Sequence, residues 1–364
     1  MKTRGATRSL TVLSELLFRP CAGGDTEADH GLEMDTHFSE SDFADLLVLA
    51  SSNHVIVRAF GRFRKHMATS GKAWVARWAD NAIQSEQARI NHALPFLESI
   101  CAALQEGGCE AVVIKSLDHW PDLGSDLDLY TNGDAASVVE IMKSRLQARL
   151  EPRSWGDRLA NKWNFVVPGL PELVEVHVGR LGQTGEQIAI AGSLVDRSQE
   201  IQIAAHRFQV PSPEDRLLIS TLQRMYRHFY IRLCDVADTA QLLESGSVNY
   251  ARLRSSASSG GLWDGLATYL RIVSDYVKSY RRTGTPLPSP VSAASRFGGD
   301  QVTFSKGFLR IPILPHSAGL YASELKRLLL NGELRNSVRL SLLPCLATAA
   351  ALEFKITGSD KGIW

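Results

Sequence analysis

The chain has 364 residues, 44% of them hydrophobic, which is enough for about two to three packed units with ample apolar core. Its 40 basic residues nearly cancel its 39 acidic ones, so no net field draws the whole molecule to nucleic acid or to an anionic membrane. Five cysteines, odd in number and never spaced Cys-x-x-Cys, argue against a zinc knuckle or a disulfide framework and favour a reducing cytoplasm.

Helical patterns dominate the start of the chain, where we expect an N-terminal helical region over residues 1–106. Ser39-x-x-Asp42 is typical of a capping box at a helix start. Farther along, apolar residues recur at three- and four-residue spacing from Ile83 to Leu104, and the glycines at 107 and 108 end the pattern. A long amphipathic helix is therefore expected to lead into the next segment.

Strand patterns begin at residue 107, and we expect a core of strands and helices over 107–210. Short β-branched or alternating runs predict strands over 110–115, 127–130, 163–167 and 173–178. Asp134 is well placed to cap a helix between the second and third of these strands. The pattern predicts an α+β fold in which a small mixed-sheet core is flanked by N-terminal and C-terminal helical regions.

The C-terminal region, 211–364, is expected to be mostly helical. It opens with Ser212-Pro213-Glu214-Asp215, which combines a hydroxyl cap, a first-turn proline and acids near the positive end of the helix dipole. Ser/Gly-rich residues 255–261 and proline-rich residues 283–292 predict loops. The longest uncharged apolar run, Leu340–Leu352, has 13 residues, whereas a membrane-spanning helix needs roughly 20. We therefore expect no transmembrane segment, and a buried or interfacial helix at this run.

The clearest chemical signal is the pair of acids in Gly124-Ser125-Asp126-Leu127-Asp128. Residues two apart on an extended strand point to the same face, so Asp126 and Asp128 are expected to project side by side. The same alternation in 174–178 puts Glu175 and His177 on one face, and Glu175 completes a triad if the two strands are neighbours. Clustered carboxylates take up protons or a divalent cation, and their hard oxygens favour Mg²⁺ or Mn²⁺.

The same acids have other interpretations. Most such pairs are solvated turn residues that cap nearby amides. A calcium loop starting at Asp126 would have its third ligand in Asp128, but Tyr130, Thr131 and Ser137 do not suit its fifth, sixth and twelfth positions. A glycosyltransferase would use a D-x-D motif to bind a metal and a sugar nucleotide, although no extended Rossmann-like series of strands and helices precedes it here. That alternative stays open.

The segment resembles the polymerase-β-type nucleotidyltransferase superfamily, in which a strand, a Gly-Ser turn and a loop precede a D-x-D flanked by hydrophobic residues. More closely, the chain resembles the uncharacterised bacterial nucleotidyltransferase family, in which a Leu-Lys-Gly turn precedes the D-x-D. Lys115-Ser116 stands at the turn here. The other landmarks are a helical lead-in at 46–63, an acid-x-His strand at 175–177 and a Ser-Pro-Glu-Asp helix start. Ser116 departs from both patterns, which have glycine at its position.

The resemblance implies an enzyme that moves an NMP from an NTP to an unidentified acceptor and releases pyrophosphate. Asp126 and Asp128 would be catalytic carboxylates that bridge two Mg²⁺ or Mn²⁺ ions, and Glu175 would hold one of the two. The NTP and the acceptor are the expected partners, and the near-zero net charge weighs against nucleic acid.

A further set of residues is expected to bind the triphosphate. Four lie in the segment before and within the D-x-D loop and two lie on the helix after Ser212: Lys115, Ser116, Gly124, Ser125, Arg224 and Arg227. On that helix, Arg224, His228 and Arg232 share one face. These candidates also have simpler interpretations: a solvated lysine at a strand end, an ordinary turn, and a solvated basic helix surface. Nearby aspartates suggest internal salt bridges for the arginines.

A second hypothesis, from another functional class, is a catalytically inactive nucleotide-binding or regulatory protein on the same fold. It is motivated by Ser116, because a glycine at this turn would let the backbone approach a triphosphate closely.

Overall fold

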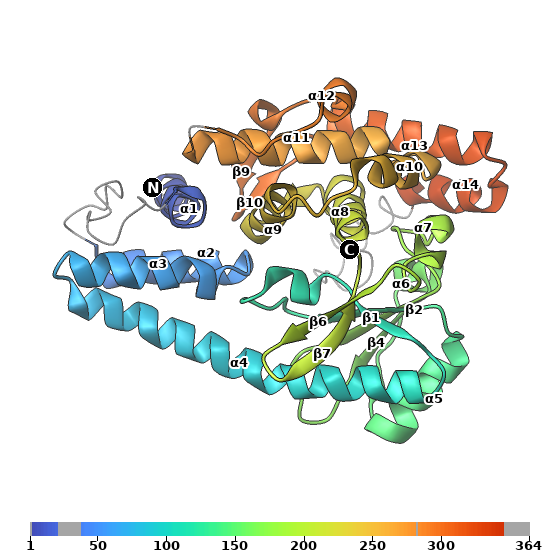
Figure 1. The fold of residues 1–364 in the computed structure, drawn as a ribbon, viewed down its shortest axis with the longest axis horizontal. Helices are drawn as coiled ribbons and strands as arrows, with labels where there is room; N and C mark the ends of the chain where they lie inside the picture. The colour runs from blue at the N-terminus through green and yellow to red at the C-terminus, as the bar shows by residue number, and fades with distance from the viewer. Residues whose placement is uncertain (1, 21–37, 282, 346–364) are drawn as a thin grey trace.

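The computed structural model describes residues 2–20, 38–281 and 283–345, and Figure 1 gives the labels of its elements. Its N-terminal helices are α1 (Lys2–Phe18), α2 (Glu40–Ser52), α3 (Ile56–Thr69) and α4 (Ala73–Glu106). The predicted capping box is confirmed, since the Ser39 hydroxyl accepts a hydrogen bond from the Asp42 amide and the Asp42 carboxylate accepts one from the Ser39 amide. The long helix that the apolar spacing predicts is α4, which ends directly before the paired glycines.

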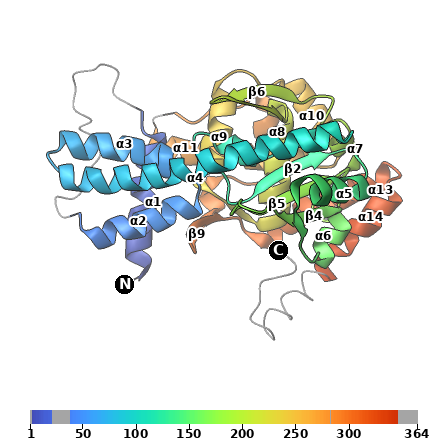
Figure 2. The same ribbon diagram turned by 90° about the horizontal axis from the view of Figure 1, so that it is seen from below.

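Helix α4 connects two separate hydrophobic cores. Its 34 residues span about 51 Å at 1.5 Å per residue. Buried residues in its first half, from Val75 to Ile83, pack with the N-terminal and C-terminal helices. Those from Ile90 to Leu104 pack with the sheet, which α4 crosses in Figure 2. The helix therefore fixes the sheet relative to the helical part of the molecule.

The central sheet has five strands in the order β1-β2-β5-β4-β3. Its strands and the short helices between them are β1 (Ala111–Val113), η1 (Ser116–His119), β2 (Leu127–Thr131), α5 (Ala135–Leu146), β3 (Arg149–Leu150), α6 (Trp155–Ala160), β4 (Lys162–Val166) and β5 (Val174–Val178). Strands β2 and β5 are parallel, whereas the other neighbouring pairs are antiparallel, so the sheet is mixed. The predicted α+β fold with a small mixed sheet is confirmed.

The two faces of this sheet have different roles. Leu127, Leu129, Val174 and Val176 are buried against α4 and α5. The residues that alternate with them, Asp128 on β2 and Glu175 on β5, point to the other face, as the period of two along a strand requires. The apolar face anchors the sheet and leaves the acidic face for chemistry.

Beyond the sheet come a hairpin, β6 (Gln199–Ile203) and β7 (His206–Val210), and then the C-terminal helices, which Figure 1 shows above the sheet. The other elements are α7 (Ile188–Gly192), α8 (Pro213–Thr221), η2 (Leu222–His228), β8 (Tyr230–Ile231), α9 (Leu233–Glu244), α10 (Tyr250–Ser259), α11 (Trp263–Tyr280), α12 (Ser289–Ala294), η3 (Gly299–Gln301), β9 (Thr303–Ser305), β10 (Phe308–Arg310), η4 (Ile313–Ser317), α13 (Ala318–Leu330) and α14 (Leu334–Ser341).

Parts of both loops predicted for this region are helical instead, since residues 255–259 lie in α10 and residues 289–292 lie in α12. Asn249 caps α10, and Leu253 and Ala257 bury its apolar side. The region also contains a three-stranded sheet, β8-β10-β9, that the helical pattern did not predict. Short strands of two or three residues leave too little alternation in the sequence to be recognised.

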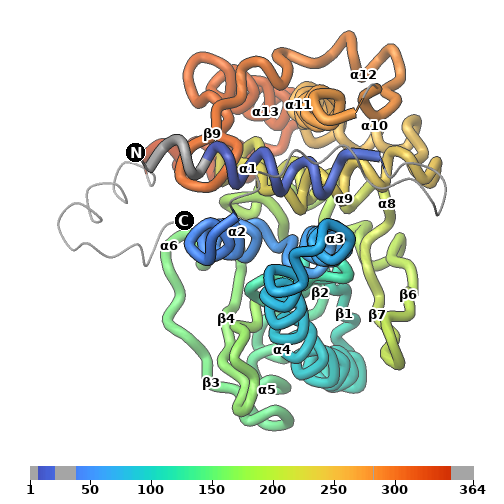
Figure 3. The backbone as a smooth tube through the Cα atoms, turned by 90° about the vertical axis from the view of Figure 1, so that its left-hand side faces the viewer, coloured from blue at the N-terminus to red at the C-terminus, as the bar shows by residue number. Residues whose placement is uncertain are grey.

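The N-terminal and C-terminal helices share one hydrophobic core although they are far apart in sequence. Figure 3 shows α1 lying beside the C-terminal helices, where the Ser14 and Tyr276 hydroxyls hydrogen-bond at 2.7 Å. The boundaries at 106/107 and 210/211 remain predictions.

Within the described residues, none of the helices combines the length and the apolar character that crossing a bilayer requires. Most of the predicted apolar run 340–352 lies outside the described residues, as does Cys21. The other four cysteines carry free thiols.

Two buried glutamates lie where α13 meets the core, and Glu324 is the more perturbed of them. Gln187 donates a hydrogen bond to Glu324 Oε1 at 2.5 Å. Burial, and then the charge of Glu186, raise the pKa of Glu324 well above its ordinary value. Glu324 therefore stays protonated in the folded protein at a pH where the unfolded chain has already ionised, and this difference costs stability as the pH rises.

We expect Glu324→Gln to stabilise the protein at pH 8 and to have little effect at pH 4.5. Glutamine cannot ionise but still accepts the bond from Gln187, so the variant escapes the loss of stability that the wild type undergoes above the unfolded pKa. Thermal melts at both pH values measure the difference, with Glu140→Gln on the exposed side of α5 as the control. Equal melting temperatures of variant and wild type at pH 8 would contradict the assignment.

Candidate functional site

The two predicted strand carboxylates meet on the acidic face of the sheet. Asp128 on β2 and Glu175 on β5 are register partners on parallel strands, and their side chains are 15% and 13% exposed. Asp126 precedes β2 and lines the same cleft. The predicted triad of Asp126, Asp128 and Glu175 required the two strands to be neighbours, and they are.

A cleft of about 340 Å³ lies over this face. All nine residues that the sequence analysis selected line it: Lys115, Ser116, Gly124, Ser125, Asp126, Asp128, Glu175, Arg224 and Arg227. They come from the sheet, from the turn after β1, from the loop before β2 and from η2. Their chemical roles stay predictions, but the fold gathers them around one space.

The turn after β1 is strained at Lys115 and not at Ser116. Lys115 has φ 61° and ψ −55°, and the Ser116 amide donates to the Ile114 carbonyl at 2.6 Å, which makes a γ-turn centred on the lysine. Such a conformation costs on the order of 1–3 kcal/mol and is concentrated at functional sites. Ser116 does not have a positive φ, so its side chain adds no left-handed strain where the resembled families have glycine.

The Ser116 hydroxyl holds the acidic segment in place. It donates a hydrogen bond to the Asp126 carbonyl at 3.0 Å and accepts one from the Asp128 amide at 2.8 Å. Ser116 is 1% exposed, so this hydroxyl is engaged inside the protein. Its side chain thereby sets the position of both aspartates at the start of β2.

Two lysines and a histidine contact the strand carboxylates. Lys115 Nζ lies 2.6 Å from Asp128 Oδ1, and Lys162 Nζ lies 2.7 Å from Glu175 Oε2. His177 Nε2 lies 2.7 Å from Glu175 Oε1. Burial opposes ionisation, but Lys115 and the His177 hydrogen bond hold the pKa of Glu175 well below its ordinary value. Glu175 is therefore ionised and already has partners of positive or donor character.

Asp126 has the opposite electrostatic setting. Asp126 is exposed to solvent, but partial desolvation in the cleft, followed by the charges of Asp128 and Glu175, raises its pKa to about 6. Among the described residues, no hydrogen bond or ion pair engages its carboxylate. Asp126 is thus the member of the triad that most lacks a cation.

Arginines from η2 and the start of α9 form the basic part of the lining. Arg224 is 2% exposed, and its Nε pairs with Asp235 Oδ2 at 2.8 Å, which confirms the internal salt bridge that the sequence suggested. Arg227 and Arg232 are half-buried, and within the described residues their guanidinium groups have no carboxylate partner. The cleft therefore presents unpaired carboxylate oxygens together with unpaired guanidinium groups.

One part of the helix prediction is wrong. Arg232 does not continue the face of Arg224 and His228, because the helix ends at His228 and Phe229 takes a left-handed conformation with φ 53°. Arg232 instead precedes α9 as its N-cap residue. All three still reach the cleft, because the chain turns back along its wall through β8.

The family model described as "Uncharacterised nucleotidyltransferase" matches residues 39–278, well over half of the chain. The chain belongs to this family. It is a nucleotidyltransferase enzyme, so the resemblance noted in the sequence is confirmed and nucleotidyl transfer is its general activity.

Comparison with individual proteins gives only distant matches for this nucleotidyltransferase. No curated protein matches it. Among solved structures it is similar to the antibiotic-resistance factor ANT(2'')-Ia, at 13% identity and a TM-score of 0.34 over 47% of this chain and 90% of that one. It is also similar to an antigenic nucleotidyltransferase-like protein from Paracoccidioides brasiliensis, at 14% identity and a TM-score of 0.33 over 52% of this chain and 93% of that one.

A buried ionic network supports the cleft of the nucleotidyltransferase from behind. His119 Nδ1 lies 2.5 Å from Asp238 Oδ2, and Arg58 NH1 lies 2.6 Å from Asp238 Oδ1. Although burial opposes it, the neighbouring Cys234 and Asp238 raise the pKa of His119 well above its ordinary value. The network ties α3, η1 and α9 together beneath the substrate space.

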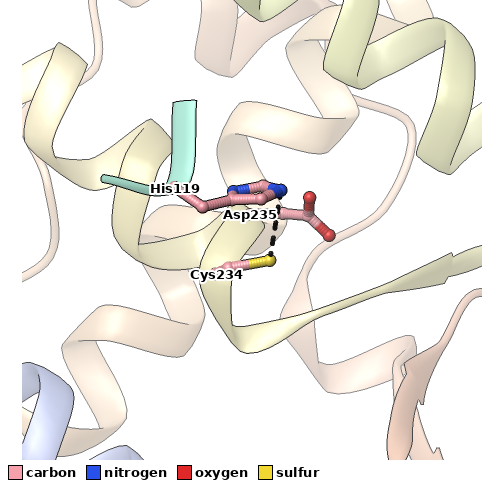
Figure 4. Close-up of side chains that lie close together, drawn as sticks. All are labelled: His119, Cys234 and Asp235. Carbon is pink, nitrogen blue, oxygen red and sulfur yellow. Dashed lines mark hydrogen bonds between the residues drawn. The ribbon is translucent and has the colours of Figure 1, made fainter. Parts of the chain in front are cut away.

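Figure 4 shows that His119, Cys234 and Asp235 lie close together in this network, with ligand atoms within 4.8 Å of one another. A metal could approach these atoms, but Asp235 Oδ2 already accepts from the Arg232 amide at 2.7 Å and pairs with Arg224. His119 likewise has Asp238, so internal partners account for this group.

The sequence analysis missed two residues that shape the site. Lys162, at the start of β4, is 6% exposed and reaches Glu175. Arg89 on α4 donates to the Leu123 and Gly124 carbonyls and pairs with Glu172 at 2.8 Å, which clamps the loop before Asp126. The alternation that revealed Glu175 also places Lys162 on a strand face, but nothing local indicates which strand lies beside it.

We expect Mn²⁺ to bind the nucleotidyltransferase roughly tenfold more weakly at pH 5 than at pH 7, because Asp126 must lose its proton to act as a ligand and has a pKa of about 6. The free Mn²⁺ signal in electron paramagnetic resonance titrations gives the affinity at each pH. Asp126→Asn should remove most of this dependence. An equally steep dependence in that variant would assign the titration to another group.

Proposed function

We propose that this nucleotidyltransferase moves an NMP from an NTP to an acceptor hydroxyl or similar group, with a divalent cation held by Asp126 and Asp128. The observation that carries the proposal is that unpaired carboxylate oxygens and unpaired arginines line one cleft. The acceptor oxygen forms a bond to the α-phosphorus, the bond from that phosphorus to the β-phosphate oxygen breaks, and the acceptor proton passes to water. Pyrophosphate is the leaving group.

The donor set fits Mg²⁺ or Mn²⁺, which prefer hard oxygen ligands. Within the described residues, neither the Asp126 carboxylate nor Asp128 Oδ2 has a hydrogen bond or an ion pair, so these oxygens are available. When bound, the ion would neutralise charge on the phosphates and lower the pKa of the acceptor.

The chain's own cations are suited to hold the triphosphate. Arg227 and Arg232 offer guanidinium donors that match phosphoryl oxygens, and no carboxylate competes for them within the described part of the chain. The Arg232 guanidinium lies 5.8 Å from the centre of the Tyr230 ring, which restrains its position. Arg224 forms an ion pair with Asp235, so we propose that Arg224 holds η2 against α9 rather than binding phosphate.

We expect Asp126→Asn and Asp128→Asn each to lower label transfer from an α-labelled NTP by about 100-fold or more, because several kcal/mol of charge stabilisation would be lost in the transition state. Both substitutions keep side-chain size, and Asp45→Asn on the exposed face of α2 is the matched control. Pyrophosphate release is measured in parallel. Turnover of a sugar nucleotide with release of a nucleoside diphosphate would instead support the glycosyltransferase alternative.

We expect Arg227→Ala to weaken NTP binding about tenfold or more, since a hydrogen bond to a charged group contributes about 1.5–3 kcal/mol. Isothermal titration with a nonhydrolysable NTP analogue measures the affinity. Arg252→Ala, on an exposed face of α10, removes the same charge far from the cleft lining and should leave the affinity unchanged. Unchanged affinity in Arg227→Ala would remove Arg227 from the phosphate site.

A further inference from the structure

Both carboxylate oxygens of Glu175 already have hydrogen-bonding or ion-pair partners within the protein. Oε1 lies 2.7 Å from His177 Nε2 and 3.7 Å from Lys115 Nζ, and Oε2 lies 2.7 Å from Lys162 Nζ. Asp128, Glu175 and His177 offer ligand atoms within 4.8 Å of one another, but a cation at Glu175 would have to compete with these groups for its oxygens. Of these neighbours, Lys162 is held most firmly.

Lys162 is fixed by its strand and by a second carboxylate. It is the register partner of His177 across β4 and β5, so its side chain points to the acidic face beside Glu175. Its Nζ also lies 3.1 Å from Asp157 Oδ1, and the side chain is only 8% exposed. Moving this ammonium away would leave Asp157 without its partner and a charge without compensation in a nearly buried place.

Among the carboxylates and lysines of the cleft, counted apart from its arginines, the remaining negative charge matches one divalent ion. Four carboxylates line this part of the cleft, Asp126, Asp128, Asp157 and Glu175, and two lysines, Lys115 and Lys162, pair with three of them. The excess is two negative charges. The oxygens without a partner belong to Asp126 and Asp128, so the uncompensated charge and the available ligands coincide.

We propose that the cleft takes a single divalent cation, between Asp126 and Asp128, and that the Lys162 ammonium held by Glu175 and Asp157 stands in place of a second one. This rests on the proposed nucleotidyl transfer. Glu175 is then a positioning residue for Lys162 rather than a metal ligand. An ammonium group has three N–H donors, and two carboxylates leave one for a substrate oxygen.

The test counts the ions in the full-length protein. Mn²⁺ is titrated in the presence of one equivalent of an α,β-methylene nucleoside triphosphate, chosen from the four bases as the one that most raises the melting temperature. Free Mn²⁺ is followed by electron paramagnetic resonance. We expect one bound ion per chain in the wild type and two in Lys162→Met, because the variant frees Glu175 and Asp157 for a second ion. Lys143→Met, on the exposed side of α5, should bind one.

Two bound ions in the wild type would overturn the single-ion site and leave the proposed transfer intact. A single ion in a folded Lys162→Met would also overturn it, and Lys162→Gln gives the same comparison if the methionine variant does not fold. No bound Mn²⁺ with any of the four nucleotides would remove the metal-dependent transfer itself, and the single-ion site with it.

Discussion

Repulsion between carboxylates is the constraint on which the cleft depends. Parallel pairing of β2 and β5 puts Asp128 directly beside Glu175, and the charges of these two acids add to desolvation in raising the pKa of Asp126. The fold answers this repulsion in two ways. Lysines and a histidine compensate Glu175 inside the protein, whereas Asp126 is left with an ionisation that a cation would favour. The two acids therefore differ, because Glu175 is compensated inside the protein and the Asp126 carboxylate has no hydrogen bond or ion pair among the described residues.

The geometry of the acids is set by groups that never need to touch a substrate. Ser116 bonds to the backbone on either side of Leu127, and Arg89 holds the two carbonyls before Ser125. Because Arg89 lies on α4, it fixes the loop before Asp126 to the helix that packs in both hydrophobic cores. A strained residue such as Lys115 can persist only when its surroundings are fixed to this degree.

The arginines of η2 and α9, which form the basic side of the cleft, depend on the hydrophobic core shared by the N-terminal and C-terminal helices. Helices α1 to α3 pack with α8 to α11, so η2 and the start of α9 are held over the sheet. The ion pair of Arg224 with Asp235 and the ion pairs of Asp238 then fix the orientation of η2 and α9 beside the cleft. The strand carboxylates and the arginines of η2 and α9 are therefore held by different parts of the molecule and line the same cleft.

Local patterns sufficed for a large part of this protein. Alternation of residues predicted β2 and β5 and placed Glu175 on one strand face with His177, and capping signals predicted the starts of α2, α5 and α8. A period of two or 3.6 is a property of a single strand or helix, so it can be recognised without the rest of the chain. The same holds for the D-x-D motif, which indicated the family that the match over residues 39–278 confirms.

What only the tertiary structure decided is which charges meet. Lys162 is 13 residues from Glu175 in the sequence, yet the pairing of β4 with β5 makes it a direct partner, and Asp238 finds Arg58 and His119 from distant helices. The end of η2 was also set by packing, because Tyr230 and Ile231 pair with β10 instead of continuing a helix. Strand order and long-range ion pairs arise from contacts between remote segments, and no local spacing encodes them.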